Sequence, residues 1–349
     1  MPDTLPASLR LHIDRAALQH NWLHLDRMSG SANAAAAVKA DAYGVGVEHA
    51  VPALRDAGAS EFFVAHWSEV SRVAVHVPPR SIAVLHGPNT REEADFARSL
   101  GVVPVINSLH QAQIWSASGG GRCHLMVDSG INRLGLSLGD VGAAIIGELE
   151  VDCLMSHLAS ADEDSAMNEL QLDRFASVFG VIGHKRRSFA NSAGIALGPA
   201  YHFDQTRPGL ALYGGVPRAE LANDIRQVAY PQAAVIQLRD IEAGDGVGYN
   251  ATFVADRDMR VAVISIGYAD GFLRPRGPGS SVQWKGESLP ILGKVSMDMI
   301  VVDASASMGL REGDWLDIPF SLPETAAKSG ISQYELLTTI GNRFDRSTI

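Results

Sequence analysis

Residues 34–44 read AAAAVKADAYG, an apolar run that ends on a lysine. A short run without polar alternation is typical of a strand that is buried on both faces of a parallel sheet. Similar runs recur up to about residue 213 and alternate with segments of helical periodicity. The predicted strands cover residues 34–39, 61–65, 82–86, 102–106, 123–127, 151–157, 188–191 and 208–213. Eight strands with helices between them predict a (β/α)8 barrel, with a doubly wound open sheet as the alternative.

The character of the sequence changes near residue 225. Further β-segments are predicted at residues 233–241, 260–266, 282–284, 289–303 and 314–318, separated by turns that contain Gly, Asp and Pro. Ser332 and Glu335 have the spacing of a capping box, which predicts that a helix begins there. We therefore expect a barrel domain over residues 1–225 and a mostly β C-terminal domain over residues 226–349.

The composition excludes several classes of protein. A hydrophobic content of 46% with 19% charged residues predicts a folded globular chain. The net charge of −10 argues against binding to a nucleic-acid backbone. The two cysteines, Cys123 and Cys153, are too few for a disulfide framework and fit a reducing compartment. No apolar run is long enough to cross a membrane, and residues 1–10 do not resemble a signal peptide. These features predict a cytoplasmic protein without nucleic-acid or membrane partners.

Polar residues follow the ends of several predicted barrel strands. Active-site residues of a (β/α)8 barrel lie at the carboxyl ends of its strands, so these side chains are expected to converge. They are Lys39 after the first strand, Arg133 after the fifth, His157 at the end of the sixth, Asn191 and Ser192 after the seventh, and Arg207 and Gly209 near the eighth. A purely structural barrel has no need of a lysine, two arginines and a histidine at one rim.

Lys39 is the most informative of these residues. A desolvated lysine has a lowered pKa and becomes a nucleophile toward aldehydes; the alternative is a lysine that extends into solvent. Residues 191–194, Asn-Ser-Ala-Gly, resemble an anion cradle, and phosphate sites after strands seven and eight recur in this barrel. The alternatives are an ordinary helix cap for this stretch and a structural role for His157.

Four motifs together resemble the alanine racemase family, and the resemblance covers nearly the whole chain. Residues 37–44, AVKADAYG, look like that family's cofactor-lysine signature, and residues 247–253, VGYNATF, look like the motif that carries its second catalytic base. Residues 267–271, GYADG, and 293–298, GKVSMD, are similar to motifs that line the path and carboxylate site of the substrate. The family fold is a (β/α)8 barrel followed by a β domain, to which a first strand near residues 9–13 would also belong.

The resemblance implies a role for each site residue. Lys39 would hold pyridoxal 5'-phosphate covalently, Tyr43 and Ser192 would contact its phosphate beside Asn191 and backbone donors near Gly209, and Arg207 would face the pyridine nitrogen with His157 alongside. Arg133 would touch the cofactor's phenolic oxygen and the substrate carboxylate. The partner subunit of a homodimer would supply Tyr249, Tyr268, Met297 and Asp298. No metal is expected, and the activity would supply D-alanine for peptidoglycan.

Racemisation requires one proton to leave one face of the α-carbon and another to arrive at the opposite face, so two bases should flank the cofactor. Lys39 can serve one face and Tyr249 of the partner subunit the other. A tyrosine has a pKa near 10, so this phenol needs a cationic neighbourhood, for which His157 and Arg207 are the candidates. Arg207 stays charged and should leave the ring nitrogen unprotonated, which favours return of the proton to the α-carbon.

The chain departs from the family pattern at three places. Met126 stands where many relatives have a lysine that is often carbamylated, so Arg133 must be supported by another group, such as Asn132 or an anion. Residues 341–343, Gly-Asn-Arg, stand where some relatives have a tyrosine that reaches the phosphate, and Asn250 replaces a common glycine. None of these changes removes a reacting group.

Three other functions are alternatives to alanine racemisation. A decarboxylase of basic amino acids with the same fold uses a cysteine motif in the second domain, whereas both cysteines here lie in the predicted barrel. A racemase of broader or different specificity, for serine or lysine, is compatible with the same residues. A non-enzymatic carrier of the cofactor lacks the second domain, so residues 226–349 and Tyr249 argue against it.

Overall fold

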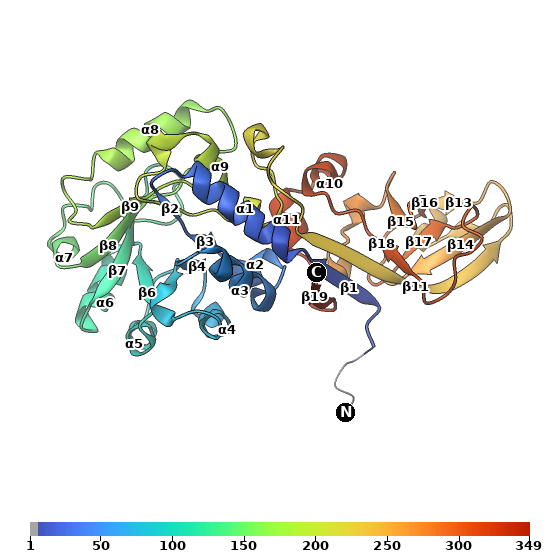
Figure 1. Ribbon diagram of the computed structural model, residues 1–349, viewed down its shortest axis with the longest axis horizontal. Coiled ribbons are helices and arrows are strands. Elements are labelled where there is room, and N and C mark those ends of the chain that lie inside the picture. The colour runs from blue at the N-terminus through green and yellow to red at the C-terminus, as the bar shows by residue number, and fades with distance from the viewer. Residues whose placement is uncertain (1–5) are drawn as a thin grey trace. The chain divides into compact units, whose positions relative to one another are not determined.

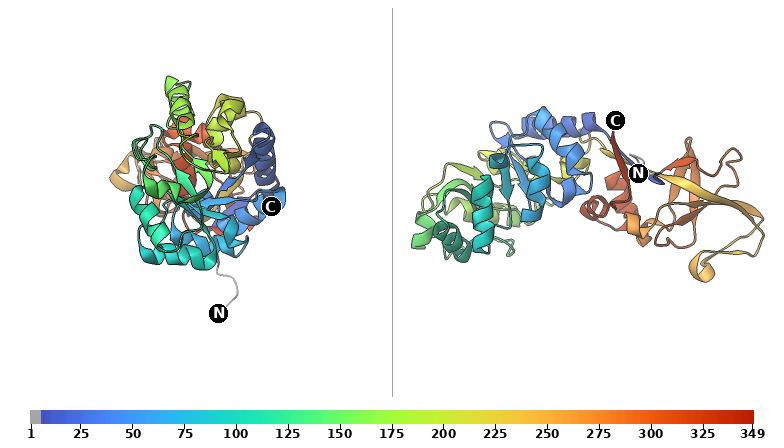
Figure 2. Two further views of the ribbon diagram at one scale, coloured as in Figure 1. Left: turned by 90° about the vertical axis from the view of Figure 1, so that its left-hand side faces the viewer. Right: turned by 90° about the horizontal axis from the view of Figure 1, so that it is seen from below.

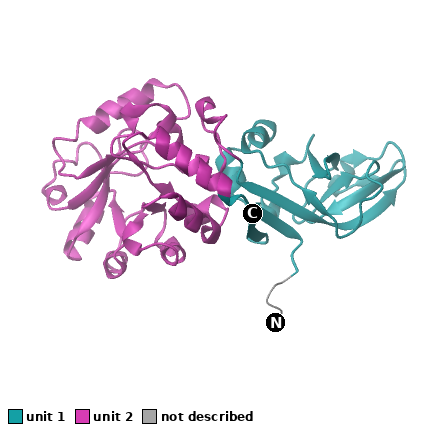
Figure 3. Cartoon of the chain, in the orientation of Figure 1, with its two compact units in different colours: residues 1–15, 227–349 teal, residues 16–226 magenta. Residues whose placement is uncertain are grey.

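The computed structural model describes residues 6–349, which fall into two compact units (Figures 1 and 3). One unit is formed by residues 16–226. The other combines the described residues up to Arg15 with residues 227–349. Among the described residues, no helix is both long and apolar enough to cross a membrane.

The first unit is a parallel barrel with helices around its outside (Figures 1 and 2). The sheet order is β2-β10-β9-β8-β7-β6-β5-β4-β3, and the neighbouring strands in this order are parallel. Its strands are β2 (Asn33–Ala34), β3 (Ala36–Ala37), β4 (Phe62–Val64), β5 (Ile82–Val84), β6 (Val103–Ile106), β7 (Arg122–Met126), β8 (Glu150–Met155), β9 (Arg186–Ser188) and β10 (Gln205–Thr206).

The barrel closes at Ala35, which separates β2 from β3. β2 pairs with β10 on one side, while β3 pairs with β4 on the other. The amide of Ala35 donates to the carbonyl of Thr206 and the amide of Ala36 to the carbonyl of Glu61, both at 2.9 Å. Since β2 and β3 are consecutive parts of one strand, the nine segments correspond to the eight strands of the barrel. The predicted (β/α)8 barrel is confirmed, and the open sheet is wrong.

The helical segments of this unit begin where the sequence provides caps. Thr90 accepts a hydrogen bond from the amide of Glu93, and Ser108 accepts one from Gln111, both at 3.2 Å. The segments are α1 (Arg15–Met28), α2 (Lys39–Tyr43), α3 (Val47–Ala57), η1 (Trp67–Glu69), α4 (Val70–Ala74), η2 (Pro79–Ser81), α5 (Arg91–Leu100), α6 (Leu109–Ala117), α7 (Ala144–Gly147), α8 (Ala166–Ala176), α9 (Ser192–Ala196), η3 (Pro199–Tyr201), η4 (Leu210–Tyr213) and η5 (Ala219–Leu221), where η marks a 3₁₀ turn.

The last two barrel strands lie earlier in the chain than predicted. Residues 208–213 are not a strand; β10 ends at Thr206, and residues 210–213 form the 3₁₀ turn η4. Pro208 has no N–H group for a strand ladder, so the apolar run after it continues in another conformation. Likewise, β9 covers residues 186–188 because Asn191 caps α9.

The interior of the barrel is filled by apolar side chains from its strands. The buried cluster consists of Ala35, Phe63, Ala83, Val105, Met126, Cys153 and Met155. Both cysteines are buried and free. The barrel is therefore a packed core, and its chemistry must lie at its ends.

The second unit is built on an eight-stranded sheet of order β14-β17-β16-β15-β18-β11-β1-β19, with a further pairing of β14 to β11. The long strand β11 pairs with β1 and β18 in its first half and with β14 in its second, and the register shifts between Val235 and Gln237. The strands are β1 (Leu9–Ile13), β11 (Ala229–Ile241), β12 (Gly246–Val247), β13 (Phe253–Val254), β14 (Met259–Ile264), β15 (Ser281–Trp284), β16 (Glu287–Leu292), β17 (Ile300–Asp303), β18 (Trp315–Asp317) and β19 (Asp345–Thr348).

Two features of this unit differ from the sequence prediction. The single segment predicted at residues 289–303 is two strands, β16 and β17, because Gly293 turns the chain with φ +66°. A helix over residues 322–329 was not predicted. The helix predicted at Ser332 is confirmed, with the reciprocal capping box to Glu335. The helical segments are η6 (Tyr249–Ala251), η7 (Tyr268–Asp270), η8 (Arg274–Arg276), α10 (Leu322–Ser329) and α11 (Gln333–Thr338).

Candidate active site

The predicted rim residues lie at the carboxyl ends of the barrel strands. Lys39 begins α2, two residues after β3, and His157 lies two residues after β8. Arg133 is in the loop after β7, and Arg207 directly follows β10. The charges of both arginines act on Lys39 and on His157. The structure therefore brings these four residues together at one end of the barrel.

The turn that carries Lys39 has an unusual backbone. Ala40, Asp41, Ala42 and Tyr43 all have φ between 53° and 55°. This left-handed region is unfavourable for residues with a Cβ atom, at roughly 1–2 kcal/mol per residue. Four such residues in succession must be held by the surrounding structure, and strain of this kind is concentrated at functional sites.

The environment of Lys39 lowers the pKa of its amine. The largest cause is burial, and the positive charges of Arg133 and Arg207 act in the same direction. The carboxylate of Glu69 acts in the opposite direction. A lysine with a lowered pKa is more often in its neutral, nucleophilic form.

His157 is partly buried in the same cationic surroundings. Burial is the main cause that lowers the pKa of its imidazole to about 3, followed by the charges of Arg207, Arg133 and Lys39. The ring is therefore neutral near pH 7. The prediction that His157 provides positive charge is wrong, since a half-buried imidazole beside three cationic groups loses its proton.

Arg207 is buried and held by neutral acceptors. Its guanidinium donates to the hydroxyl of Ser188 at 2.5 Å and to the backbone carbonyl of Ser156 at 2.6 Å. Burial lowers the pKa of Arg207 to about 10, so the group remains charged at neutral pH. Arg207 therefore provides a fixed positive charge, and its hydrogen-bond acceptors are a hydroxyl and a carbonyl rather than a carboxylate.

A small polar cradle is formed by Tyr43, Ser192 and Gly209. The Ser192 hydroxyl oxygen accepts hydrogen bonds from the amides of Gly209 at 2.9 Å and Ala211 at 3.2 Å. A Cβ atom at position 209 would clash with the Tyr43 hydroxyl, so only glycine permits this approach. A phenol, an alcohol and backbone N–H groups in one place are suitable donors for a phosphate.

Other contacts hold the two sides of this cradle. The Asn191 side chain accepts from the amide of Gly194 at 2.9 Å and so caps the short helix α9. The rings of Tyr43 and Tyr213 stack with centroids 4.9 Å apart, and the Tyr213 hydroxyl donates to the carbonyl of Ala37 at 2.9 Å. Tyr213 was not singled out from the sequence, because an aromatic residue in an apolar run is ordinarily part of a core.

The loop of Arg133 is organised by Asp128. The carboxylate of Asp128 accepts from the amides of Gly130 at 2.8 Å, Asn132 at 3.2 Å and Arg133 at 3.1 Å. Met126, at the position of the family's lysine, is only 5% exposed and packs in the apolar interior. The structure thus assigns the ordering of this loop to a backbone-binding carboxylate.

The motifs of the second unit also lie together. The amide of Tyr268 donates to the carbonyl of Ser296 at 3.1 Å, and that of Ala269 to the carbonyl of Met297 at 3.0 Å. Gly293 packs so closely against Val247 that a Cβ atom at position 293 would approach the carbonyl oxygen of Val247 to 2.8 Å. This contact places the motif of Tyr249 beside the other two motifs. The side chains of Tyr249 and Met297 are 64% and 53% exposed.

Arg343 connects two of these motifs and was not recognised in the sequence. Its guanidinium donates to both carboxylate oxygens of Asp270, at 2.6 and 2.7 Å, and to Asp298 at 2.7 Å. The stretch 341–343 that departs from the family pattern therefore anchors Asp298. Since the partners are 45 and 73 residues away, no local sequence signal indicates this contact.

Comparisons with known proteins agree with this arrangement. The family model for the alanine racemase N-terminal domain matches residues 13–217, and that for the C-terminal domain matches residues 228–348. A biosynthetic alanine racemase of Agrobacterium fabrum is 38% identical and covers 97% of this chain and 93% of its own. An alanine racemase of Rhizobium meliloti is also 38% identical, over 100% and 98%.

Among solved structures, an alanine racemase of Bartonella henselae with covalently bound pyridoxal phosphate has a TM-score of 0.90 and 34% identity over 99% of this chain and all of that one. The biosynthetic alanine racemase of Pseudomonas aeruginosa has a TM-score of 0.86 and 33% identity, with coverage of 99% and 100%. Both domain models and these full-length relatives lead to one conclusion. The chain belongs to the alanine racemase family.

Proposed function

We propose that this protein interconverts L-alanine and D-alanine with pyridoxal 5'-phosphate held on Lys39. The observation that carries the proposal is Lys39, which lies at the end of a strand and directly before a strained turn. Burial and the charges of two arginines lower the pKa of its amine. The full-length relatives named alanine racemase support the choice of substrate. Supply of D-alanine for peptidoglycan is part of the same proposal.

The residues present fit the cofactor. Tyr43, Ser192 and the amide of Gly209 would hold its phosphate, because they form a cradle that a Cβ at position 209 would fill. Asn191 keeps the α9 side of this cradle in place. When bound, pyridoxal phosphate supplies an electron-withdrawing ring that stabilises negative charge at the α-carbon of an amino acid.

Arg207 and His157 set the electrostatics around that ring. Arg207 has only donors and keeps its proton near pH 7, so it can hydrogen-bond to a ring nitrogen without protonating it. An unprotonated ring nitrogen withdraws fewer electrons, which favours rapid return of a proton to the α-carbon. His157 is neutral and packs beside Arg207 without adding charge.

Two groups would move the proton. The Lys39 amine, with its lowered pKa, can take a proton from one face of the α-carbon or return it there. The phenol of Tyr249 of the partner subunit would serve the opposite face, in keeping with its 64% exposure within its own chain. Arg207 is then the cation that would favour its phenolate form.

The remaining residues would bind the substrate. Arg133, which is exposed and whose loop is ordered by Asp128, would pair with the substrate carboxylate. The partner subunit's Met297 and the partner subunit's Asp298 would complete this carboxylate site, and Tyr268 of the partner subunit would line the path of the substrate. The functional unit proposed here is a homodimer with shared active sites.

The first test is an assay of the purified protein. Incubation with L-alanine should yield D-alanine until the two enantiomers reach equal concentrations. If part of the purified protein lacks the cofactor, added pyridoxal phosphate should raise the rate. L-serine and L-lysine serve as matched substrates. Racemisation of either one faster than alanine, or release of carbon dioxide from lysine, would contradict the proposed specificity.

The shared site has its own test. Lys39→Ala and Tyr249→Phe homodimers should each be nearly inactive, while a refolded mixture should regain roughly a quarter of the activity. Random mixing makes about half of the dimers mixed, and isologous two-fold symmetry gives each of these one intact site. No gain in activity, with mixed dimers confirmed by differential tags, would contradict the pairing of Lys39 with Tyr249 of the partner subunit.

A further inference from the structure

The carboxylate of Glu69 holds three backbone amides at the mouth of the barrel. One oxygen, Oε1, accepts a hydrogen bond from the amide of Ala40 at 2.5 Å. The other, Oε2, accepts from the amides of Ala65 and His66, both at 2.8 Å. Glu69 thus links the end of β4 to the residue that directly follows Lys39.

The contacts of the two oxygens differ in kind. The bond from His66 to Oε2 is half of the capping box of the 3₁₀ turn η1, which is an ordinary local contact. The bond from Ala40 to Oε1 joins segments 29 residues apart in the chain. A helix cap needs only the first of these, so the second calls for a separate explanation.

The turn held by Oε1 is the left-handed one that begins at Ala40. At roughly 1–2 kcal/mol per left-handed residue, residues 40–43 would relax unless both ends were fixed. Asp41, the second residue of the turn, accepts from the amide of Val47 beyond the far end at 2.9 Å and pairs with Arg72 at 3.0 Å. At the near end, next to Lys39, the amide of Ala40 donates to the side chain of Glu69.

Glu69 also differs from the other groups around Lys39 in its charge. Arg133 and Arg207 both lower the pKa of the lysine, whereas the Glu69 carboxylate raises it. The two imidazoles whose pKa values respond to Lys39 are His157 and His86, and both are lowered. Among the groups that act on Lys39, Glu69 is thus the counter-charge.

We infer that Glu69 is a positioning residue for Lys39: it fixes the start of the left-handed turn and supplies the negative charge beside the amine. The inference rests on the proposed function, in which Lys39 holds the cofactor. Glu69 itself does not touch the reacting atoms in this scheme. It acts by holding the backbone that aims the lysine.

The test uses Glu69→Gln, which preserves size but replaces one oxygen by an NH₂ group that faces an N–H donor. The full-length chain is freed of cofactor and mixed with pyridoxal phosphate, and attachment to Lys39 is followed over a range of pH by borohydride trapping and peptide mass spectrometry. We expect the equilibrium attachment to weaken by about ten- to a hundredfold, as for a lost hydrogen bond to a charged group. The midpoint of the pH profile should also move to lower pH, because the charge that raises the Lys39 pKa is removed.

Two further variants make the result specific. Glu93→Gln is the matched control, since Glu93 holds the amide of Asn89 at 2.6 Å in the loop after β5 and is not bonded to the turn of Lys39. It should leave both readouts unchanged. Glu69→Asp keeps the charge but shortens the reach, so it should weaken attachment while the pH midpoint stays near that of the parent; it carries the test if Glu69→Gln does not fold.

The outcomes separate this inference from the proposed function. If Glu69→Gln lowers only the melting temperature, and attachment and pH midpoint match the parent, Glu69 is merely structural and the inference is wrong. If Glu69→Asp moves the pH midpoint as far as Glu69→Gln does, the role of its charge is wrong. If the parent protein itself carries the adduct on another lysine, the proposed function fails, whatever Glu69 does.

Discussion

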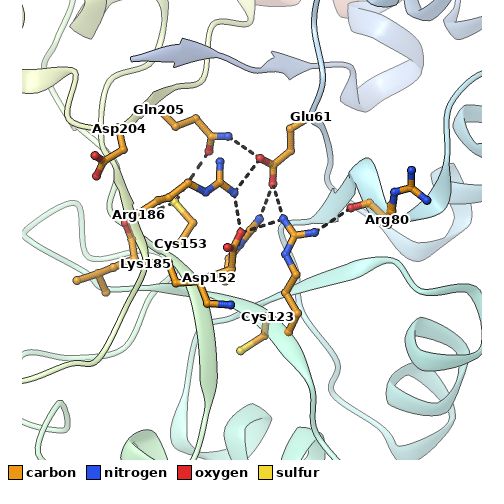
Figure 4. Close-up of polar contacts among 12 residues, drawn as sticks. Glu61, Arg80, Cys123, Asp152, Cys153, Lys185, Arg186, Asp204 and Gln205 are labelled. Atoms are coloured by element: carbon orange, nitrogen blue, oxygen red, sulfur yellow. Dashed lines mark hydrogen bonds and ion pairs between the residues drawn. The ribbon is translucent and has the colours of Figure 1, made fainter. Parts of the chain in front are cut away.

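The two ends of the barrel handle charge in opposite ways. At the amino-terminal end, the carboxylates of Glu61 and Asp152 pair with Arg186, as Figure 4 shows. Arg122 and the buried His124 also lie within 3.9 Å of both carboxylates. At the carboxyl-terminal end, Lys39, Arg133, His157 and Arg207 lie together, and Glu69 is the carboxylate that acts on Lys39. One end is electrostatically balanced, and the other is left positive and strained.

The balanced end is tightly bonded. Arg186 donates to Asp152 at 2.6 Å and to Glu61 at 3.1 Å, and Glu61 also accepts from Gln205 at 2.6 Å and contacts His124 at 2.7 Å. These bonds join β7, β8, β9 and β10 to the start of β4. Atoms of Glu61, His124 and Asp152 lie within 4.8 Å of one another, a spacing compatible with a cation. The arginines already neutralise both carboxylates, so this cluster is explained as a structural clamp.

In this barrel, the groups that stabilise the fold and the groups proposed to react lie at opposite ends. At the balanced end the arginines neutralise both carboxylates, and within this cluster only His124 Nδ1 is buried without a hydrogen-bond partner. At the reactive end, burial lowers the pKa values of Lys39, His157 and Arg207, and Arg207 donates only to neutral acceptors. This end therefore gains from an anionic cofactor and an amino-acid carboxylate. Substitutions at the two ends should therefore affect different measurements.

The largest effect is expected from Lys39→Ala. Loss of the base that also holds the cofactor should lower the rate of alanine racemisation by about 10⁴-fold. The melting temperature of the cofactor-free variant should equal or exceed that of the cofactor-free parent, because a desolvated amine is removed from a positive site. The matched control is Lys185→Ala, whose exposed side chain pairs with Glu150 at 3.4 Å. A variant that retains a tenth of the parental rate would contradict the assignment.

Glu61→Ala should produce the reverse pattern. Removal of one partner from a buried ion-pair network costs about 3 kcal/mol of unfolding free energy, while kcat for alanine should change less than twofold. Glu150→Ala is the control, since an exposed pair contributes at most about 1 kcal/mol. Urea unfolding and racemase kinetics on the same preparations measure both effects. A large fall in kcat without loss of stability would contradict the division between the two ends.

The two ends should also lose stability at different pH. Hydrogen bonds from His124 and charge from Arg186 hold the pKa of Glu61 well below its usual range despite burial, so its contribution is present above about pH 4.5 and is lost as the pH falls below that value. Burial lowers the pKa of His157 to about 3 in the folded protein, whereas an unfolded histidine has a pKa near 6.5. As the pH falls below about 6.5, the unfolded chain therefore binds a proton at His157 that the folded chain does not, and the stability of the fold declines.

Each effect can be removed separately. His157→Gln should flatten the dependence of unfolding free energy on pH between about 6.5 and 4.5, and Glu61→Gln should flatten it below about 4.5. Chemical unfolding at a series of pH values measures both slopes. An unchanged slope in either variant would show that its residue does not set the pH dependence of its own end.

The smallest effect is expected from Ser188→Ala. The Ser188 hydroxyl accepts a hydrogen bond from Arg207, and its loss leaves a charged donor with one fewer acceptor, at about 1.5–3 kcal/mol of stability. The carbonyl of Ser156 still holds Arg207, so kcat should fall by less than about tenfold. A tenfold fall corresponds to an increase of about 1.36 kcal/mol in the activation free energy. A loss of kcat as large as that of Lys39→Ala would mean that Arg207 depends on Ser188 alone.

The sequence predicted what repeats locally and missed what forms at long range. Apolar runs indicated six of the barrel strands closely, and the lysine at the end of the first one indicated the site. The left-handed turn after Lys39 was not predicted, because Ala, Asp and Tyr have no preference for it. The contacts of Glu69 with Ala40 and of Arg343 with Asp270 span 29 and 73 residues and leave no periodic pattern.

One error has a local physical cause, and another has a long-range cause. The eighth strand was placed on an apolar run that Pro208 excludes from the sheet, so the strand lies before Arg207 and not after it. His157 was expected to carry charge because an isolated imidazole titrates near pH 6.5. Its pKa depends on burial and on three cations that come from other strands, which the sequence does not reveal.

The most direct test of the central claim is the identity of the lysine that holds the cofactor. The protein as purified is reduced with borohydride, digested and mapped by mass spectrometry for the pyridoxyl adduct. We expect the adduct on Lys39, at the reactive end of the barrel, and none on the exposed Lys185. An adduct on any other lysine, with Lys39 unmodified, would contradict it.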